Sequence, residues 1–422
     1  MKLAVWKHRL ATSAIFLVLM SALVAWWFQA EPPAIANVAA APPPMEDGPS
    51  VSEPAIPFKP KGEPAASSPS GAGRAGEVHV CGLGYLPATT RLDQLSPKSR
   101  AQLEQTSTDL IERLQRSGSV RARSASLLLR VIVTLEDERT ASSDAVYAAC
   151  REGSNANVKH GKGSPCNLAQ VVDEQLTDRY LEKVTPYVTE LAAVASTSED
   201  PAVYAQAIQA CARLPSQNQP PACGTTISLE QWARLEPGNM LPWLRLVGER
   251  TQSAATEALF RASLGAFVED YQGLAAIELS RLAQSDIDQL LALQLSTKVL
   301  INWALPNYAP LIKMCSADSA KDANRRQVCD RTANILMSSA DNVLAAVIGL
   351  KIGEALGWER HSVEERRKEA QSLNAVLYGE QPDETVAHLD CNQVKVKLRQ
   401  IIEIAHKGEW IAGKALKSRR AQ

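Results

Sequence analysis

The side chains best suited to covalent chemistry are eight cysteines, which all lie beyond residue 80. Spacing groups six of them into pairs 16, 12 and 14 residues apart, each flanking a polar stretch between predicted helices: Cys150 and Cys166, Cys211 and Cys223, Cys315 and Cys329. Cys81 and Cys391 remain, one near each end of this region. An even number of cysteines in an oxidising compartment is typical of disulfides. We therefore predict three local disulfides and one that joins the two ends.

Zinc binding is the alternative chemistry for the terminal pair. His79 lies two residues before Cys81, and His388 lies three residues before Cys391. A meeting of the two ends would therefore bring together two histidines and two thiols, a ligand set that Zn²⁺ favours. The spacings are not those of a zinc finger, and an oxidising compartment favours the disulfide. We predict no metal site and no cofactor.

Catalytic motifs are absent from the sequence. It contains no G-x-S-x-G, no H-E-x-x-H and no phosphate-binding glycine loop followed by Lys-Ser or Lys-Thr. Acidic and basic residues are mixed between positions 359 and 369, a pattern typical of a solvated helix face. We predict no catalytic residue and favour a role without catalysis. A hydrolase whose active site is assembled only by the fold is the alternative.

An uncharged apolar stretch determines the predicted compartment. Residues 10–28, from Leu10 to Phe28, follow a leader that contains Lys2, Lys7 and Arg9. About 20 apolar residues cross a bilayer as a helix, and the more basic flank stays in the cytoplasm. We predict a single-pass anchor in the inner (cytoplasmic) membrane, with the N-terminus inside and the remainder exported to the periplasm. Secretion after cleavage of a signal peptide is the alternative.

The segment after the anchor has the composition of a tether. Residues 31–76 are rich in Pro, Ala, Ser and Gly, which predicts a linker without a stable fold, ahead of a folded region at residues 78–416. The whole chain of 422 residues has a formal net charge of −1. Because nucleic-acid binding depends on neutralising many phosphates, this balance gives no reason to expect a nucleic-acid partner.

Helical signals dominate residues 78–416. Ser96 followed by Pro97 is typical of a helix start, and apolar residues recur at helical spacing, with an interruption expected near Pro186. Only residues 78–86 look extended. Gly349 and Gly353 indicate close packing against another helix, and Gly357 would end their helix. The prediction is an all-α fold, an array of antiparallel helical hairpins held by disulfides.

Residues 233–248 carry the most specific pattern. A helix ends on a leucine, an acid–proline–x–asparagine turn follows, and proline and tryptophan open the next helix. This stretch resembles the junction between tetratricopeptide repeats, as one divergent unit over about residues 229–264. An irregular bundle in which the tryptophan is ordinary core is the alternative. The resemblance implies packing positions at Leu235, Pro237, Asn239, Pro242, Trp243 and Leu246.

A tetratricopeptide-like surface implies binding of a protein or peptide rather than a reaction. We expect the exported domain to be a binding or scaffold module with a partner in the cell envelope. An envelope hydrolase and a structural assembly factor without a dissociable ligand are the alternatives. A groove lined by polar and aromatic side chains would favour binding, whereas a deep pocket with converging acid, histidine or serine groups would favour hydrolysis.

Overall fold

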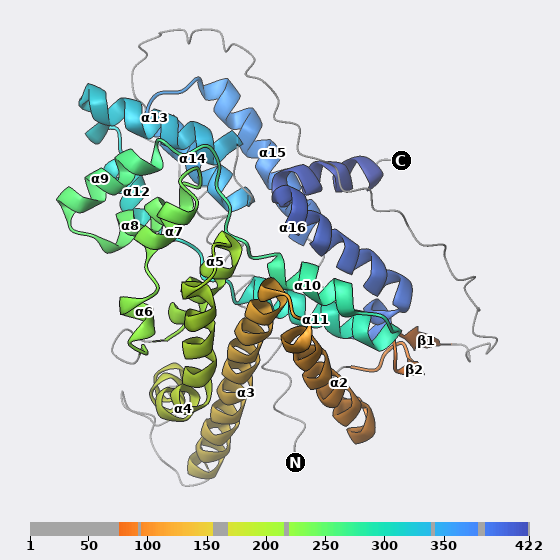
Figure 1. The fold of residues 1–422 in the computed structure, drawn as a ribbon. Coiled ribbons are helices and arrows are strands. Elements are labelled where there is room, and N and C mark those ends of the chain that lie inside the picture. The colour runs from red at the N-terminus through yellow and green to blue at the C-terminus, as the bar shows by residue number, and fades with distance from the viewer. Residues whose placement is uncertain are drawn as a thin grey trace.

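The computed structural model describes residues 76–91, 94–154, 168–214, 219–338, 342–378 and 385–420, without the side chains of residues 139–179 and 320. These ranges are mostly helical, which confirms the predicted secondary-structure class (Figure 1). No helix within them is long and apolar enough to cross a membrane. The predicted anchor at residues 10–28 and the linker up to residue 75 lie outside the described residues.

Two short strands precede the helices, β1 (Glu77–Val80) and β2 (Gly84–Pro87), and two 3-10 helices occur later, η3 (Ser319–Lys321) and η4 (Val386–Leu389). The α-helices follow in chain order: α2 (Pro97–Arg116), α3 (Val120–Ser154), α4 (Leu168–Ser196), α5 (Pro201–Cys211), α6 (Ala222–Thr225), α7 (Leu229–Leu235), α8 (Leu241–Glu249), α9 (Gln252–Ala262), α10 (Leu274–Leu282), α11 (Asp286–Ile301), α12 (Ala309–Met314), α13 (Ala323–Ser338), α14 (Val343–Ala355), α15 (Arg360–Tyr378) and α16 (Cys391–Arg420).

The strands β1 and β2 form an antiparallel hairpin. This hairpin joins the beginning of the described chain to the segment just before α16. The backbone N–H of Cys81 donates to the carbonyl of Leu389 at 2.9 Å, and Val80 forms a bridge with Asp390. Cys81 is disulfide-bonded to Cys391, 310 residues further along the chain. The first strand therefore lies beside the first residue of α16, and the extended segment predicted at residues 78–86 is confirmed.

The main core contains buried residues of α2 to α5 and of α7 to α14, and α3 and α4 lie side by side. In α3, Leu127, Leu128, Val131 and Ile132 are completely buried. The start of α2 is capped as expected, because the Ser96 hydroxyl accepts a hydrogen bond from the Ser99 N–H at 3.0 Å. Local capping signals and helical periodicity thus agree with the packing.

The interruption expected near Pro186 is wrong, since α4 continues through this proline. A proline inside a helix loses one backbone hydrogen bond and costs about 3 kcal/mol. Val184, Val188 and Leu191 surround it and are all buried, with α3 as the main neighbour of α4. Burial of these side chains on both sides of Pro186 offsets the lost hydrogen bond and keeps the helix intact.

Two glycines allow α14 to approach its neighbours closely, and the predicted contact with another helix occurs at Gly349. A Cβ atom on Gly349 would lie 2.6 Å from the Ala333 carbonyl oxygen of α13, and one on Gly353 would lie 2.2 Å from the Trp358 ring. Gly357 follows the end of α14 with a φ of 85°, a conformation that favours glycine.

The last helix, α16, packs against α10, α11 and α15 and bends at Gly408, where φ is 74° and ψ is 159°. Figure 1 shows its two segments running in different directions from this bend. The residue after the bend, Glu409, is only 7% exposed. The bend therefore directs a carboxylate into the protein.

Candidate functional site

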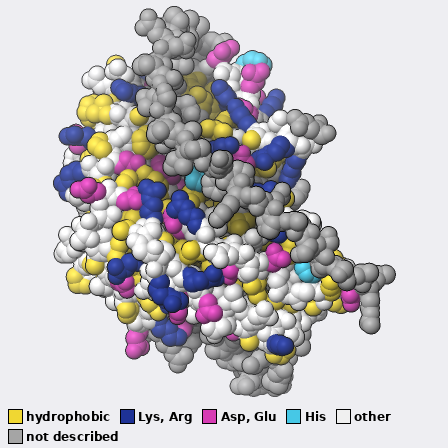
Figure 2. Space-filling view, turned by 45° about the vertical axis from the view of Figure 1, so that its right-hand side comes forward, with side chains coloured by type: hydrophobic (Ala, Val, Ile, Leu, Met, Phe, Trp, Pro, Cys, Tyr) yellow, Lys and Arg dark blue, Asp and Glu magenta, His cyan; other side chains and the backbone are white. Residues whose placement is uncertain are grey.

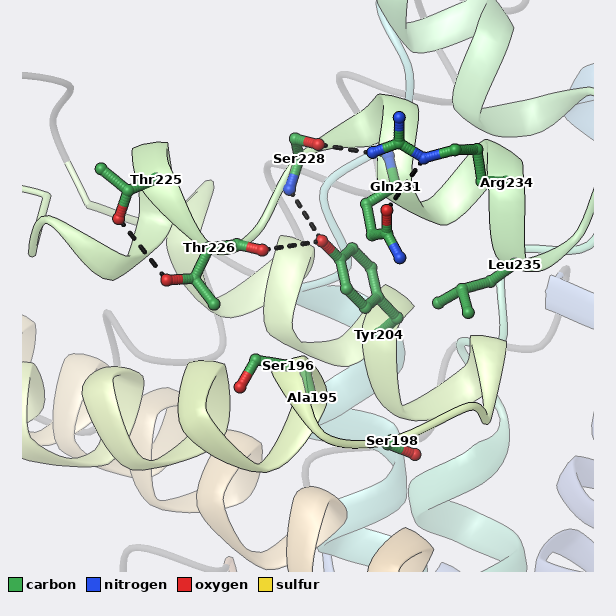
Figure 3. A pocket seen from close by; sticks show the side chains of 10 residues that line it. All are labelled: Ala195, Ser196, Ser198, Tyr204, Thr225, Thr226, Ser228, Gln231, Arg234 and Leu235. Carbon is green, nitrogen blue, oxygen red and sulfur yellow. Dashed lines mark hydrogen bonds between the residues drawn. The ribbon is translucent and has the colours of Figure 1, made fainter.

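A polar pocket of about 350 Å³ lies where the end of α4, the helix α5 and the helix α7 meet (Figure 3). Its volume falls within the range of about 300 to 1,000 Å³ found for ligand sites. Arg234 is the one charged side chain in the lining, which otherwise offers hydroxyl, amide and apolar groups: Ala195, Ser196, Ser198, Tyr204, Thr225, Thr226, Ser228, Gln231, Arg234 and Leu235. Such donors suit a ligand that bears a carboxylate or another hydrogen-bond acceptor.

Tyr204 of α5 fixes the wall of this pocket. Its ring is 1% exposed, and its hydroxyl donates to the Thr226 carbonyl at 3.0 Å and accepts from the Ser228 N–H at 2.9 Å. Burial raises the pKa of Tyr204, so the hydroxyl keeps its proton and remains a donor. Figure 3 shows the side chain pointing toward the loop between α6 and α7.

A disulfide holds the preceding loop, which connects α5 and α6. Cys211, the last residue of α5, is bonded to Cys223 in α6, with 5.6 Å between their Cα atoms. Gln219 bridges the loop by donating to the Cys211 carbonyl at 3.0 Å. Thr225 follows two residues after Cys223, so the disulfide positions the threonine side of the pocket.

The first turn of α7 positions the guanidinium group. The Ser228 hydroxyl caps the helix by accepting from the Gln231 N–H at 3.1 Å. The side-chain oxygen of Gln231 then accepts from Nε of Arg234 at 2.9 Å (Figure 3). Within the described ranges no carboxylate pairs with exposed Arg234, so its charge remains available to a ligand.

The turn between α7 and α8 adjoins the pocket through Leu235, which ends α7 and lines the pocket. Its central residue, Asn239, is completely buried. The Asn239 amide donates to Glu236 and to the Glu269 carbonyl, both at 2.8 Å, and its oxygen accepts from the Leu241 N–H at 3.0 Å and the Glu269 N–H at 3.2 Å. One side chain therefore fastens the turn to the segment after α9.

Glu236 extends this connection. Its second carboxylate oxygen accepts a short hydrogen bond from the Tyr271 hydroxyl. Tyr271 has a φ of 60°, which is unusual for a residue with a side chain. The Met240 N–H also donates to the Phe267 carbonyl at 3.0 Å. These hydrogen bonds hold the turn next to the pocket in one position.

The six junction residues differ in burial. Asn239, Pro242 and Leu246 are buried, Leu235 and Trp243 are partly buried, and Pro237 is exposed at the turn. The Arg261 guanidinium lies 6.0 Å from the centre of the Trp243 ring. Among these six residues, only Leu235 contributes to the lining of the polar pocket.

Replacing Asn239 with alanine is expected to lower the free energy of unfolding by about 3 kcal/mol, because it leaves the buried N–H of Leu241 and the partly buried backbone groups of Glu269 without these partners. Urea denaturation measures this change. Asn334→Ala is the matched control, since Asn334 is exposed on α13 and, among the described residues, its side chain bonds only to Asp330 of its own helix. Equal losses in the two variants would contradict the role assigned to Asn239.

A second group of polar side chains is buried where α14, α15 and α16 approach the segment after α9. Asp270 is 2% exposed, and one of its oxygens accepts from the Asn342 amide at 3.5 Å. Glu409 accepts from the Val343 N–H at 2.6 Å and from the Tyr378 hydroxyl. Burial raises the pKa of Asp270 to about 7 and raises that of Glu409 as well. This group fastens α14 to the bend in α16 and lies outside the pocket lining.

The structure contains three of the four predicted disulfides: Cys81–Cys391, Cys211–Cys223 and Cys315–Cys329. The side chains of Cys150 and Cys166, which would form the fourth, lie outside the described residues. For the zinc alternative, the metal-compatible group found among the described residues consists of Cys81, Cys391 and Asp286, without a histidine. Two of these three ligands are already bonded to each other.

The sequence did not single out Tyr204, Gln231 or Arg234. The pattern from Ser228 to Gln231 is a helix-capping signal, so it marks where α7 begins but not that a pocket lies there. No protein-family model, curated protein or solved structure matches this chain. The assignment of the site therefore rests on its geometry.

Proposed function

We propose that the helical region is an exported peptide-binding or scaffold module, held in the cell envelope by an anchor at residues 10–28. In this proposal the polar pocket receives an acidic side chain or a terminal carboxylate of the partner. The observation that carries the proposal is the exposed Arg234 guanidinium among hydroxyl and amide donors in a pocket of about 350 Å³. Guanidinium groups bind carboxylates with both charge and directed hydrogen bonds.

Binding is favoured over hydrolysis by the composition of the lining. An activated serine or threonine needs a general base within hydrogen-bond distance. The ten lining residues include Ser196, Ser198 and Ser228 but no histidine, aspartate or glutamate. The buried carboxylates Asp270 and Glu409 belong to a different group of residues.

The packing around α7, α8 and α9 supports a repeat-like unit within an array of helical hairpins. Along α9, Ala255, Leu259 and Ala262 are buried, and this helix packs mainly against α8. These are the small and apolar positions expected in the second helix of a tetratricopeptide-like unit. Trp243 lies near the start of α8 and contacts the main core. The proposed array would present the pocket at the side of this unit.

The test uses the Arg234→Gln variant and a library of synthetic peptides. The best binders of the wild-type protein are compared with copies in which Asn and Gln replace Asp and Glu and an amide replaces the terminal carboxylate. Loss of a charged hydrogen bond costs about 1.5 to 3 kcal/mol, so Arg234→Gln should weaken binding at least about tenfold. Fluorescence polarisation measures the dissociation constants.

Arg331→Gln serves as the matched control, because Arg331 is exposed on α13 and is absent from the pocket lining. It should leave affinity unchanged, and Arg234→Gln should bind the neutral peptides as well as the wild-type protein does. Binders that keep their affinity after loss of every carboxylate would refute the proposed role of the pocket. A wild-type protein that retains no peptide at all would refute the binding function.

A further inference from the structure

We propose that α16 lies against the surface of an anionic phospholipid membrane, with Val396 and Ile411 at the level of the acyl-chain boundary and its basic side chains on the lipid phosphates. The inference depends on the membrane anchor of the proposed function, because the anchor would keep the domain close to a bilayer. It goes beyond that function by assigning a membrane-facing side to the folded region.

Positive charge is concentrated on α16. Only Glu403 and Glu409 are acidic in this helix, and Glu409 is buried. The chain as a whole has a formal net charge of −1, so the excess belongs to this element and not to the protein in general. Figure 2 brings the α16 side of the molecule forward and shows Lys and Arg side chains on that face together with Asp and Glu side chains. Eight of the 30 residues of the helix are basic: Lys395, Lys397, Arg399, Lys407, Lys414, Lys417, Arg419 and Arg420.

Neighbouring carboxylates neutralise only part of this charge. Lys407 and Arg419 share Glu403, at 3.1 Å and 2.5 Å. Lys395 pairs with Asp286 at 3.3 Å and Lys414 with Glu369 at 2.8 Å. Such partly exposed ion pairs are weak, so these cations can also approach phosphates. Within the described ranges no carboxylate pairs with the remaining lysines or with the exposed arginine in the first segment: Lys397, Lys417 and Arg399.

Exposed apolar side chains accompany the charges. Val396 and Ile411 are 58% and 60% exposed, the highest values for large apolar side chains among the described residues. Arg399 lies three positions after Val396, and Lys414 lies three positions after Ile411, so each apolar side chain has a cation on the same helix face. Trp410, the residue before Ile411, instead packs against a buried cluster of α14 and α15. A basic helix with exposed apolar residues is typical of binding in the membrane interface.

The terminal disulfide places the first residue of α16 close to the end of the predicted tether. The predicted tether ends at residue 76, directly before β1. Cys81 at the end of β1 is bonded to Cys391, the first residue of α16, and their Cα atoms are 4.5 Å apart. The segment from the predicted anchor therefore reaches the folded region at the beginning of the basic helix. This continuity, together with the charge, favours a lipid surface as the occupant.

The test measures hydrogen exchange of residues 391–420 in the full chain, with vesicles of phosphatidylcholine alone or of phosphatidylcholine mixed with phosphatidylglycerol. We expect slower exchange in α16 only with phosphatidylglycerol, and loss of the slowing at high salt, because salt screens the attraction. Each basic residue near an anionic surface contributes about a fivefold factor in affinity. The combined Lys397→Gln, Arg399→Gln and Lys417→Gln variant should therefore abolish the slowing.

Lys321→Gln, Arg325→Gln and Arg331→Gln together remove the same charge from η3 and α13 and should leave the slowing intact. Equal exchange with both vesicle types, or slowing that survives the α16 variant, would overturn the inference. Slowing without vesicles that increases with protein concentration would assign this surface to a second copy of the chain instead. Failure to associate with phosphatidylcholine vesicles would refute the anchor separately, while the effect of phosphatidylglycerol still tests α16.

Discussion

Replacing Cys81 and Cys391 with alanine is expected to lower the free energy of unfolding by about 5 kcal/mol, the largest effect of any change to a described disulfide. The bond closes a loop with a sequence separation of 310 residues. A disulfide restricts the unfolded chain, and the entropy it removes grows with the logarithm of the loop length. Urea denaturation of the oxidised proteins measures the difference.

The Cys315→Ala and Cys329→Ala variant is the matched control for this comparison. Both of its cysteines are buried, as Cys81 is, but their separation is only 14 residues. A loop of about this length is worth about 3 kcal/mol. The terminal pair should therefore cost about 2 kcal/mol more, and an equal or smaller cost would contradict the role of this bond in joining the chain ends.

The terminal disulfide also has a structural context that the local one lacks. Val80, Leu389 and Val394 belong to a small cluster of eight buried residues around it, separate from the main core. A small cluster buries little apolar surface, so it contributes less to stability than the main core does. We infer that the covalent bond supplies much of the stability of this end of the protein.

Replacing Asp270 with asparagine is expected to raise stability at pH 8 and to reduce the pH dependence of stability between about pH 4 and pH 7. Burial raises the pKa of Asp270 from 3.8 to about 7, so within this window the folded protein keeps a proton that the unfolded chain has released. Stability of the wild-type protein therefore falls by about 1.4 kcal/mol per pH unit as the pH rises, a total of about 4 kcal/mol. Above pH 7 this contribution is constant.

The measurement is urea denaturation of both proteins across the pH range, with the difference in unfolding free energy plotted against pH. Asp318→Asn is the control, because pairing of exposed Asp318 with Lys321 lowers its pKa and places its titration below the window. A difference between the wild type and Asp270→Asn that does not change with pH would show that Asp270 is ionised in the folded protein.

Glu409 should add to the same trend, because burial raises its pKa in the same direction. Asp270 and Glu409 raise each other's cost of ionisation, and Arg245 only partly offsets the charge of Asp270. The positions of both acids depend on backbone features, since Glu409 follows the bend at Gly408. The buried carboxylates thus stabilise the meeting of α14 and α16 best at low pH.

Much of the fold could be predicted from local sequence signals. Ser96 and Pro97 start α2, Gly357 follows the end of α14, and Gly349 permits the close approach of α13, all as their residue types predict. The prediction at Pro186 was wrong because the hydrogen bond that the proline removes from α4 is offset by burial of its neighbours against α3. No local sequence pattern shows this burial. The tetratricopeptide resemblance and the membrane anchor stay predictions.

The sequence by itself determined the helical class, the two local cysteine pairs of the described region and the turn at Asn239, since capping groups, prolines, glycines and short loops act over a few neighbouring residues. The pair Cys81 and Cys391, 310 residues apart, followed only because these two cysteines remained after the local pairs. Only the tertiary structure decided the pocket and the buried acids. Tyr204 and Arg234 come from different helices, and Asp270 and Glu409 are far apart in the chain, so their environments exist only after packing. The sequence does not show whether a polar residue is solvated or buried, and the chemistry of that residue depends on the neighbours that the fold supplies.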